Sequence, residues 1–149
     1  MSSVTTKERP VLLVEDNARD AELLRDALED EMDISRIVHV RDGVAALEWL
    51  ERTEANGERL PLLVLLDLKM PRMTGMELLA RLRQDARFRY LPVVMMTSSQ
   101  QEQDLLGAYE LGVNAYVRKP LEFEAFVAMV RHLMHFWVRL NLLPQREVA

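Results

Sequence analysis

The sequence predicts an α/β fold in which five parallel strands form a doubly wound sheet. Short apolar segments alternate five times with segments whose apolar residues recur at helical spacing. This alternation is typical of βαβ units, whose right-handed crossovers place helices on both faces of a parallel sheet. The most apolar segment, 62–66, contains no polar residue, which indicates a strand that is buried on both faces.

Each strand and the helix after it are predicted from local patterns. Apolar runs that stop at a polar residue predict strands at 10–14, 37–40, 62–66, 93–96 and 115–117. Apolar residues three or four positions apart predict helices that cover 18–28, begin at 44, cover 76–83 and 101–111, and begin again at 123. Asn17 is the expected N-cap of the first helix, and Gly112 is the expected residue just past the end of the fourth.

The composition fits one globular domain. The chain has 149 residues, of which 49% are hydrophobic and 29% charged. It has no cysteine, which excludes disulfides and thiolate metal sites. The net charge of −5 comes without a basic stripe, so we expect no nucleic-acid partner. No apolar run approaches the ~20 residues that span a bilayer, so we expect a cytoplasmic protein without a membrane partner.

Residues able to do chemistry stand where the expected strands end. Ligands of a doubly wound sheet bind at the carboxyl ends of its strands, so these side chains should meet at one edge. The set contains three carboxylates, one hydroxyl and one ammonium, from Glu15, Asp16, Asp67, Thr97 and Lys119.

Three carboxylates at one edge repel one another unless cations compensate their charge. A hard ion such as Mg²⁺ binds one or two carboxylates and keeps water or phosphate oxygens in its other positions. No His or Cys stands at these strand ends, which disfavours zinc and copper. A carboxylate can act as the nucleophile in phosphoryl transfer. The edge is therefore interpreted as a site for Mg²⁺ and an incoming phosphoryl group.

Residues 11–121 resemble the receiver domain of response regulators, the CheY-like family, whose sheet has the flavodoxin-like order 2-1-3-4-5. The resemblance rests on motifs in the right order: Leu-Val-Glu-Asp-Asn at 13–17, Leu-Leu-Asp-Leu-Lys-Met-Pro at 65–71 with Gly75, Met-Met-Thr-Ser at 95–98, and Gly-Val-Asn-Ala-Tyr at 112–116 with Lys119-Pro120. A receiver accepts a phosphoryl group from a histidine kinase and signals by changing shape, so the resemblance implies a signalling protein and not a metabolic enzyme.

The resemblance implies a role for each matching residue. Asp67 would accept the phosphoryl group, Lys119 would pair with it, and Thr97 would move toward it on activation. Tyr116 would swing inward as a second switch residue, and the Lys119–Pro120 bond would be cis. Mg²⁺ would be held, directly or through water, by Glu15, Asp16, Asp67 and the backbone carbonyl of Lys69.

Other interpretations stay open at this point. Taken alone, Asp67 would be a turn or cap residue and Lys119 a surface lysine. A receiver without its chemistry would be only a binding module. A phosphohydrolase of the haloacid-dehalogenase type would need its nucleophile after the first strand and a second Asp where Lys69 stands. An FMN carrier would need a phosphate-binding loop where Glu15 and Asp16 would repel phosphate.

The last helix is expected to be longer than one covering helix requires. Residues 1–9 are expected to form a disordered tail, 10–134 the receiver domain, and 135–149 a helical extension with its own tail. The extension has too many apolar groups for one inward stripe, so Phe136, Trp137 and Leu140 are candidates for a homodimer interface. Its Phe-Trp…Leu-Pro ending resembles the single-domain regulators paired with bacterial phytochromes. A bacterial phytochrome is thus one candidate for the kinase partner.

Overall fold

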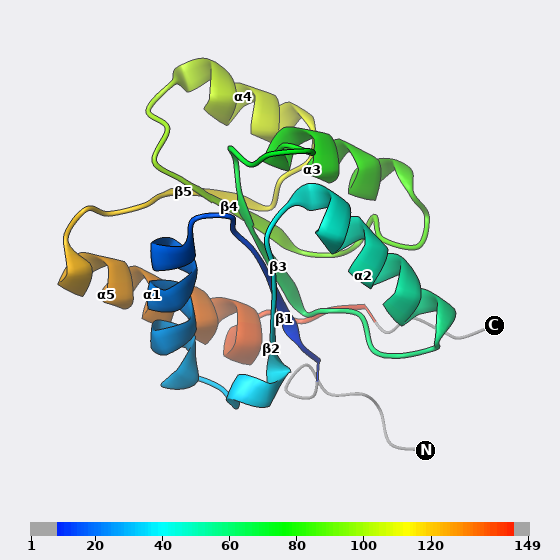
Figure 1. Ribbon diagram of the computed structural model, residues 1–149, viewed down its shortest axis with the longest axis horizontal. Coiled ribbons are helices and arrows are strands. Elements are labelled where there is room, and N and C mark those ends of the chain that lie inside the picture. The colour runs from blue at the N-terminus through cyan, green and yellow to red at the C-terminus, as the bar shows by residue number, and fades with distance from the viewer. Residues whose placement is uncertain (1–8, 145–149) are drawn as a thin grey trace.

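The computed structural model describes residues 9–144. One sheet of five parallel strands has the order β2-β1-β3-β4-β5, with helices on both faces (Figure 1). The predicted fold class and strand order are confirmed. Most of the tail expected at 1–9 lies outside the described residues. Its last residue, Arg9, is held in place because its guanidinium donates to the carbonyls of Leu60 and Pro61.

The elements agree with the predicted ones to within a few residues. The strands are β1 (Val11–Val14), β2 (Ile37–Val40), β3 (Leu63–Asp67), β4 (Val93–Thr97) and β5 (Ala115–Arg118). The helices are α1 (Ala18–Glu29), α2 (Gly43–Ala55), α3 (Gly75–Gln84), α4 (Glu102–Glu110) and α5 (Phe123–Met134). A 3₁₀ turn, η2 (Ile34–Arg36), precedes β2, and a π-helical segment, η3 (His135–Leu140), follows α5.

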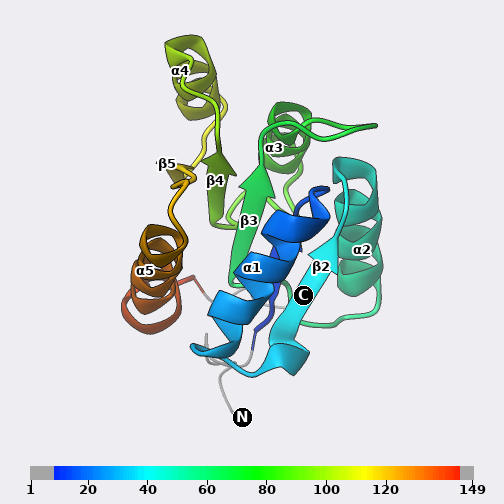
Figure 2. The same ribbon diagram turned by 60° about the vertical axis from the view of Figure 1, so that its left-hand side comes forward.

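The sheet separates two apolar clusters. In β1, Leu12 and Val14 pack with residues of α2, α3 and α4, whereas Val11 and Leu13 pack with residues of α1 and α5. Figure 2 shows these two groups of helices on opposite sides of the strands. Because side chains alternate along a strand, a strand between two helical layers must be apolar at every position. β1 is therefore buried along its whole length.

The last helix differs from the expected uninterrupted α-helix. After Met134 the backbone widens into η3, which ends where the Asn141 N–H donates to the Phe136 carbonyl at 2.7 Å. Trp137 is buried against the α1–α5 side of the core, with 9% of its surface exposed. Phe136 and Leu140 are 47% and 58% exposed. No helix within residues 9–144 is long and apolar enough to cross a membrane.

Candidate functional site

The carboxylates predicted to meet do lie together. Glu15 and Asp16 directly follow β1, and Asp67 is the last residue of the neighbouring strand β3. One carboxylate oxygen from each of these three residues lies within 4.8 Å of the others. They converge because parallel strands that pair in register end at the same edge of the sheet.

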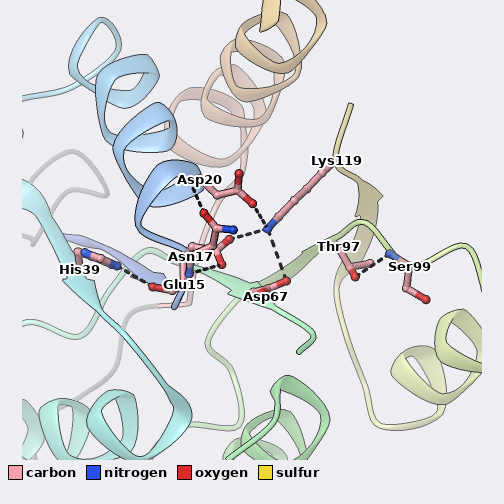
Figure 3. A network of polar contacts seen from close by, with 8 residues as sticks. All are labelled: Glu15, Asn17, Asp20, His39, Asp67, Thr97, Ser99 and Lys119. Carbon is pink, nitrogen blue, oxygen red and sulfur yellow. Dashed lines mark hydrogen bonds and ion pairs between the residues drawn. The ribbon is translucent and has the colours of Figure 1, made fainter. Parts of the chain in front are cut away.

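Lys119 completes this group and directly follows β5, the last strand of the sheet order. Its backbone N–H donates to the Thr97 carbonyl at 2.8 Å, which fixes the chain where it leaves β5. Its ammonium Nζ lies 2.6 Å from Glu15 Oε1 and 3.6 Å from Asp67 Oδ1 (Figure 3). Only 10% of the Lys119 side chain is exposed, so it is not an ordinary surface lysine.

Burial and crowding shift the acid–base behaviour of the site. Burial, helped by the nearby charge of Asp67, raises the pKa of Glu15 to about 7, against the opposing hydrogen bond from Lys119. Burial also raises the pKa of Asp67, although Lys119 opposes the shift. Burial would lower the pKa of Lys119, but the hydrogen bond to Glu15 and the Asp67 charge outweigh it and raise that pKa. One ammonium does not neutralise the carboxylates around it.

The donor atoms fit a hard divalent cation. The clustered side chains offer carboxylate oxygens, and no nitrogen or sulfur ligand belongs to this group. Oxygen-only sites suit magnesium, manganese or calcium, whereas zinc and copper favour imidazole and thiolate. A cation here would also stabilise the charged carboxylates, whose pKa values burial and, to a lesser extent, mutual repulsion raise.

The two predicted switch residues lie on β4 and β5. Thr97 is the last residue of β4 and is 2% exposed, and its hydroxyl oxygen accepts a hydrogen bond from the Ser99 N–H at 3.0 Å. The Tyr116 side chain packs against the cluster beneath α2, α3 and α4. Its hydroxyl is buried and makes no hydrogen bond within the described part of the chain. Packing against this cluster positions the Tyr116 ring.

The loop after β3 passes close over Asp67. The Gly75 N–H donates to the Leu68 carbonyl at 2.9 Å, and a Cβ on Gly75 would lie 2.3 Å from the Asp67 carbonyl oxygen. Glycine is required at this close approach. Lys69 lies in this loop, two residues after Asp67, with its side chain exposed to solvent.

One expectation from the resemblance is wrong for this structure. No peptide bond among the described residues is cis, so the Lys119–Pro120 bond is trans. Trans is the isomer that Xaa-Pro bonds prefer by about 0.5–1 kcal/mol.

Sequence reasoning missed two polar residues next to the site. The Asp20 carboxylate accepts a hydrogen bond from Lys119 Nζ at 3.0 Å. The His39 ring contacts the Glu15 carbonyl oxygen at 2.8 Å, which ties β2 to the end of β1 without reaching the carboxylates. The signal for Asp20 was its position three residues after the N-cap Asn17, because the N-terminus of α1 points at the carboxyl end of the sheet.

The chain belongs to the response regulator receiver family. The family model, described as "Response regulator receiver domain", matches residues 11–131. The chain is accordingly homologous to response regulators of two-component systems, which are signalling proteins.

The relatives include regulators linked to phytochromes. Response regulator Rcp1 of Synechocystis is 34% identical over 145 residues, which cover 97% of this chain and 99% of Rcp1. The phosphorylated cyanobacterial phytochrome response regulator RcpA is 35% identical, with a TM-score of 0.84 over 91% of this chain and 98% of RcpA. The bacteriophytochrome response regulator RtBRR is 47% identical, with a TM-score of 0.69 over 91% of this chain and 84% of RtBRR.

Proposed function

We propose that this chain is a phosphoacceptor of a two-component system, with Asp67 as the acceptor and a histidine kinase as the donor. The observation that carries the proposal is the Lys119 ammonium, held 3.6 Å from Asp67 in a group of three clustered carboxylates. An ammonium fixed beside a carboxylate nucleophile is placed to neutralise the oxygens of an arriving phosphoryl group. In this proposal the protein turns over no external metabolite, and its output is a change of shape.

The transfer requires little covalent chemistry from the protein. An Asp67 carboxylate oxygen forms a bond to phosphorus while the bond from phosphorus to the donor imidazole nitrogen breaks, and that nitrogen keeps the electron pair. Lys119 pairs with the phosphoryl oxygens. The buried Thr97 hydroxyl then donates to one of those oxygens and Tyr116 moves into the space that Thr97 leaves.

Mg²⁺ is the cation we propose for the acidic cluster. Glu15, Asp16, Asp67 and the Lys69 carbonyl would hold it, and it would neutralise phosphoryl oxygens when bound. The oxygen-only donor set supports this choice. A structure of Rcp1 in its Mn²⁺-bound form gives further support from a relative.

We further propose a bacterial phytochrome as the kinase and a homodimer as the assembly, both acting in the cytoplasm. The phytochrome link rests on RcpA and RtBRR. For the dimer, the support is an apolar groove of about 800 Å³ beside β5, α5 and η3, lined in part by Ala115, Met129, Leu133 and Phe136. The exposed side chain of Leu140 lies on the same segment, η3.

Intact mass spectrometry tests the phosphoacceptor role. The protein is incubated with Mg²⁺ and acetyl phosphate, and separately with a phosphorylated histidine kinase. We expect one added phosphoryl group that is stable in acid, labile in base and lost in Asp67→Asn. Label that persists in Asp67→Asn would remove Asp67 from its role. A wild-type protein that takes no label from either donor would leave a receiver that acts only by binding.

A further inference from the structure

We propose that Asp20 is a positioning residue, which orients the Lys119 ammonium toward the phosphoryl group on Asp67. This inference rests on the proposed function. It adds a residue outside the motifs that carry the family resemblance, on α1 rather than at the end of a strand.

The first turn of α1 fixes where Asp20 lies. Asn17 caps the helix, and its side-chain oxygen accepts a hydrogen bond from the Asp20 N–H at 3.0 Å. This contact fixes the backbone of Asp20 at the start of the helix, and the Asp20 Oδ2 lies 3.0 Å from Lys119 Nζ. The Asp20 side chain is 30% exposed, so it stands at the rim of the site and reaches inward to the buried ammonium.

The Lys119 ammonium lies near three carboxylates and donates hydrogen bonds to two of them. Two N–H groups are engaged, by Glu15 at 2.6 Å and by Asp20 at 3.0 Å. An ammonium has three donors and rotates freely unless they are held. Asp67 Oδ1 lies 3.6 Å from the ammonium nitrogen, just beyond hydrogen-bond distance, in a direction different from those of Glu15 and Asp20 (Figure 3). Glu15 and Asp20 together stop the rotation and leave one N–H for the Asp67 side.

Asp20 affects the site both by its charge and by its hydrogen bond, with opposite consequences. Removing one negative charge strengthens the attraction of an anionic phosphodonor and raises the rate at low donor concentration. Removing the acceptor releases the ammonium and lowers the maximal rate of transfer. Asp20→Asn separates the two effects, because the amide oxygen still accepts the hydrogen bond without carrying charge.

Phosphorylation kinetics provide the first test. Rates of phosphoryl incorporation from acetyl phosphate are measured by intact mass over a range of donor concentrations, with Mg²⁺ present. We expect Asp20→Ala to lower the maximal rate by about tenfold, and Asp20→Asn to stay within about threefold of the wild type. Glu22→Ala, which removes an exposed acid from the same helix, is the matched control and should leave the maximal rate unchanged.

Nitrogen-15 NMR of the lysine ammonium groups gives a readout without phosphorylation. The chain has three lysines, so Lys119→Arg suffices to assign the Lys119 signal. We expect this signal to be visible in the metal-free wild type, because a held and buried ammonium exchanges its protons slowly, and to be lost in Asp20→Ala but kept in Asp20→Asn.

Two results would overturn the inference. One is an Asp20→Ala variant with the wild-type maximal rate and an unchanged Lys119 signal. The other is an Asp20→Asn variant as slow as Asp20→Ala, since the effect would then come from charge and not from the hydrogen bond. If the wild type takes no phosphoryl group, the proposed function fails, while the NMR comparison still decides whether Asp20 holds Lys119.

Discussion

Glu15 and Asp16 are adjacent in the sequence but have different surroundings. Glu15 is 1% exposed and its carboxylate accepts a short hydrogen bond from Lys119. Asp16 is partly exposed. Lys119 forms its ion pairs with Glu15, Asp20 and Asp67, so the Asp16 carboxylate is not paired with this ammonium. We therefore expect Asp16 to be the better direct ligand of the proposed cation, because Glu15 already accepts a hydrogen bond from the ammonium.

We predict that Asp16→Ala binds divalent metal at least about tenfold more weakly than the wild type, because it removes an oxygen ligand from the cluster. Isothermal titration with Mg²⁺, repeated with Mn²⁺, measures the change in Kd. Glu22→Ala again serves as the control, since it removes the same amount of charge from the protein. Equal affinities for wild type and Asp16→Ala would place the cation elsewhere.

The elements around the site are fixed to one another by a clamp between α2 and the loop after β3. The Asp42 carboxylate caps α2 by accepting from the Ala45 N–H at 2.8 Å. It also accepts from Arg72 Nε at 2.9 Å. Arg72 belongs to the same loop as Lys69 and has a positive φ of 66°. The clamp therefore helps to fix the loop whose backbone we propose as a metal ligand.

The clamp has a pH dependence with a definite sign. Burial alone would raise the pKa of Asp42, but hydrogen bonds from the Ala45 N–H and the Arg72 side chain outweigh it and hold that pKa below its ordinary value. A carboxyl group with a lowered folded-state pKa stabilises the fold above its unfolded-state pKa of about 3.9. This stabilisation is lost as the pH falls through the folded-state pKa.

We predict that Asp42→Ala lowers the free energy of unfolding at pH 7 by about 1–3 kcal/mol, because the helix loses its cap and Arg72 its partner. Asp42→Asn should lose less, since the amide oxygen still caps α2. Urea unfolding at pH 7 and at steps down to pH 3 measures both. The amide side chain introduced by Asp42→Asn cannot titrate, so this variant should lose less stability than the wild type as the pH falls. If the stability of this variant depended on pH as the wild type's does, the lowered pKa of Asp42 would not be the cause.

Arg72→Ala isolates the loop side of the clamp. The Arg72 side chain is 59% exposed, so its ion pair should contribute less than about 1 kcal/mol. We therefore expect a smaller loss of stability than in Asp42→Ala.

For the molecule as a whole, the exposed apolar side chains of η3 mark the surface on which we propose the dimer. Phe136 and Leu140 face outward, whereas Trp137 faces the core of its own chain. Trp137 is consequently a poor probe of assembly, although its position in the sequence had made it a candidate. Changing it would disturb the fold before it disturbed any contact between copies.

We predict that Phe136→Glu and Leu140→Glu shift the protein toward monomer at micromolar concentration with little loss of stability, because each places a charge in the proposed interface. Trp137→Glu should instead lower the free energy of unfolding by roughly 3 kcal/mol or more. Sedimentation velocity and thermal unfolding separate the two effects. A wild type that is monomeric throughout, or a dimer unaffected by both outward-facing changes, would count against this interface.

The sequence by itself determined the layers of the fold and most of the site. Strands between two helical layers must be apolar throughout, and helices on a sheet must repeat their apolar residues every three or four positions, so both are visible locally. The residues that end β1, β3 and β4 could be placed together because parallel strands end at a common edge. Asp67 is therefore distinguishable from an ordinary turn residue, as the candidate nucleophile, from the order of strands and polar residues alone.

Tertiary structure alone decided which groups touch Lys119. Asp20 and Lys119 are 99 positions apart, and their hydrogen bond depends on how α1 leans over the sheet. The spacing of apolar residues along α1 does not predict the angle at which this helix packs on the sheet. The same holds for η3, where Phe136 is exposed and Trp137 is buried. Local pattern determines which face of an element is apolar, whereas the packing between elements determines which side chains meet.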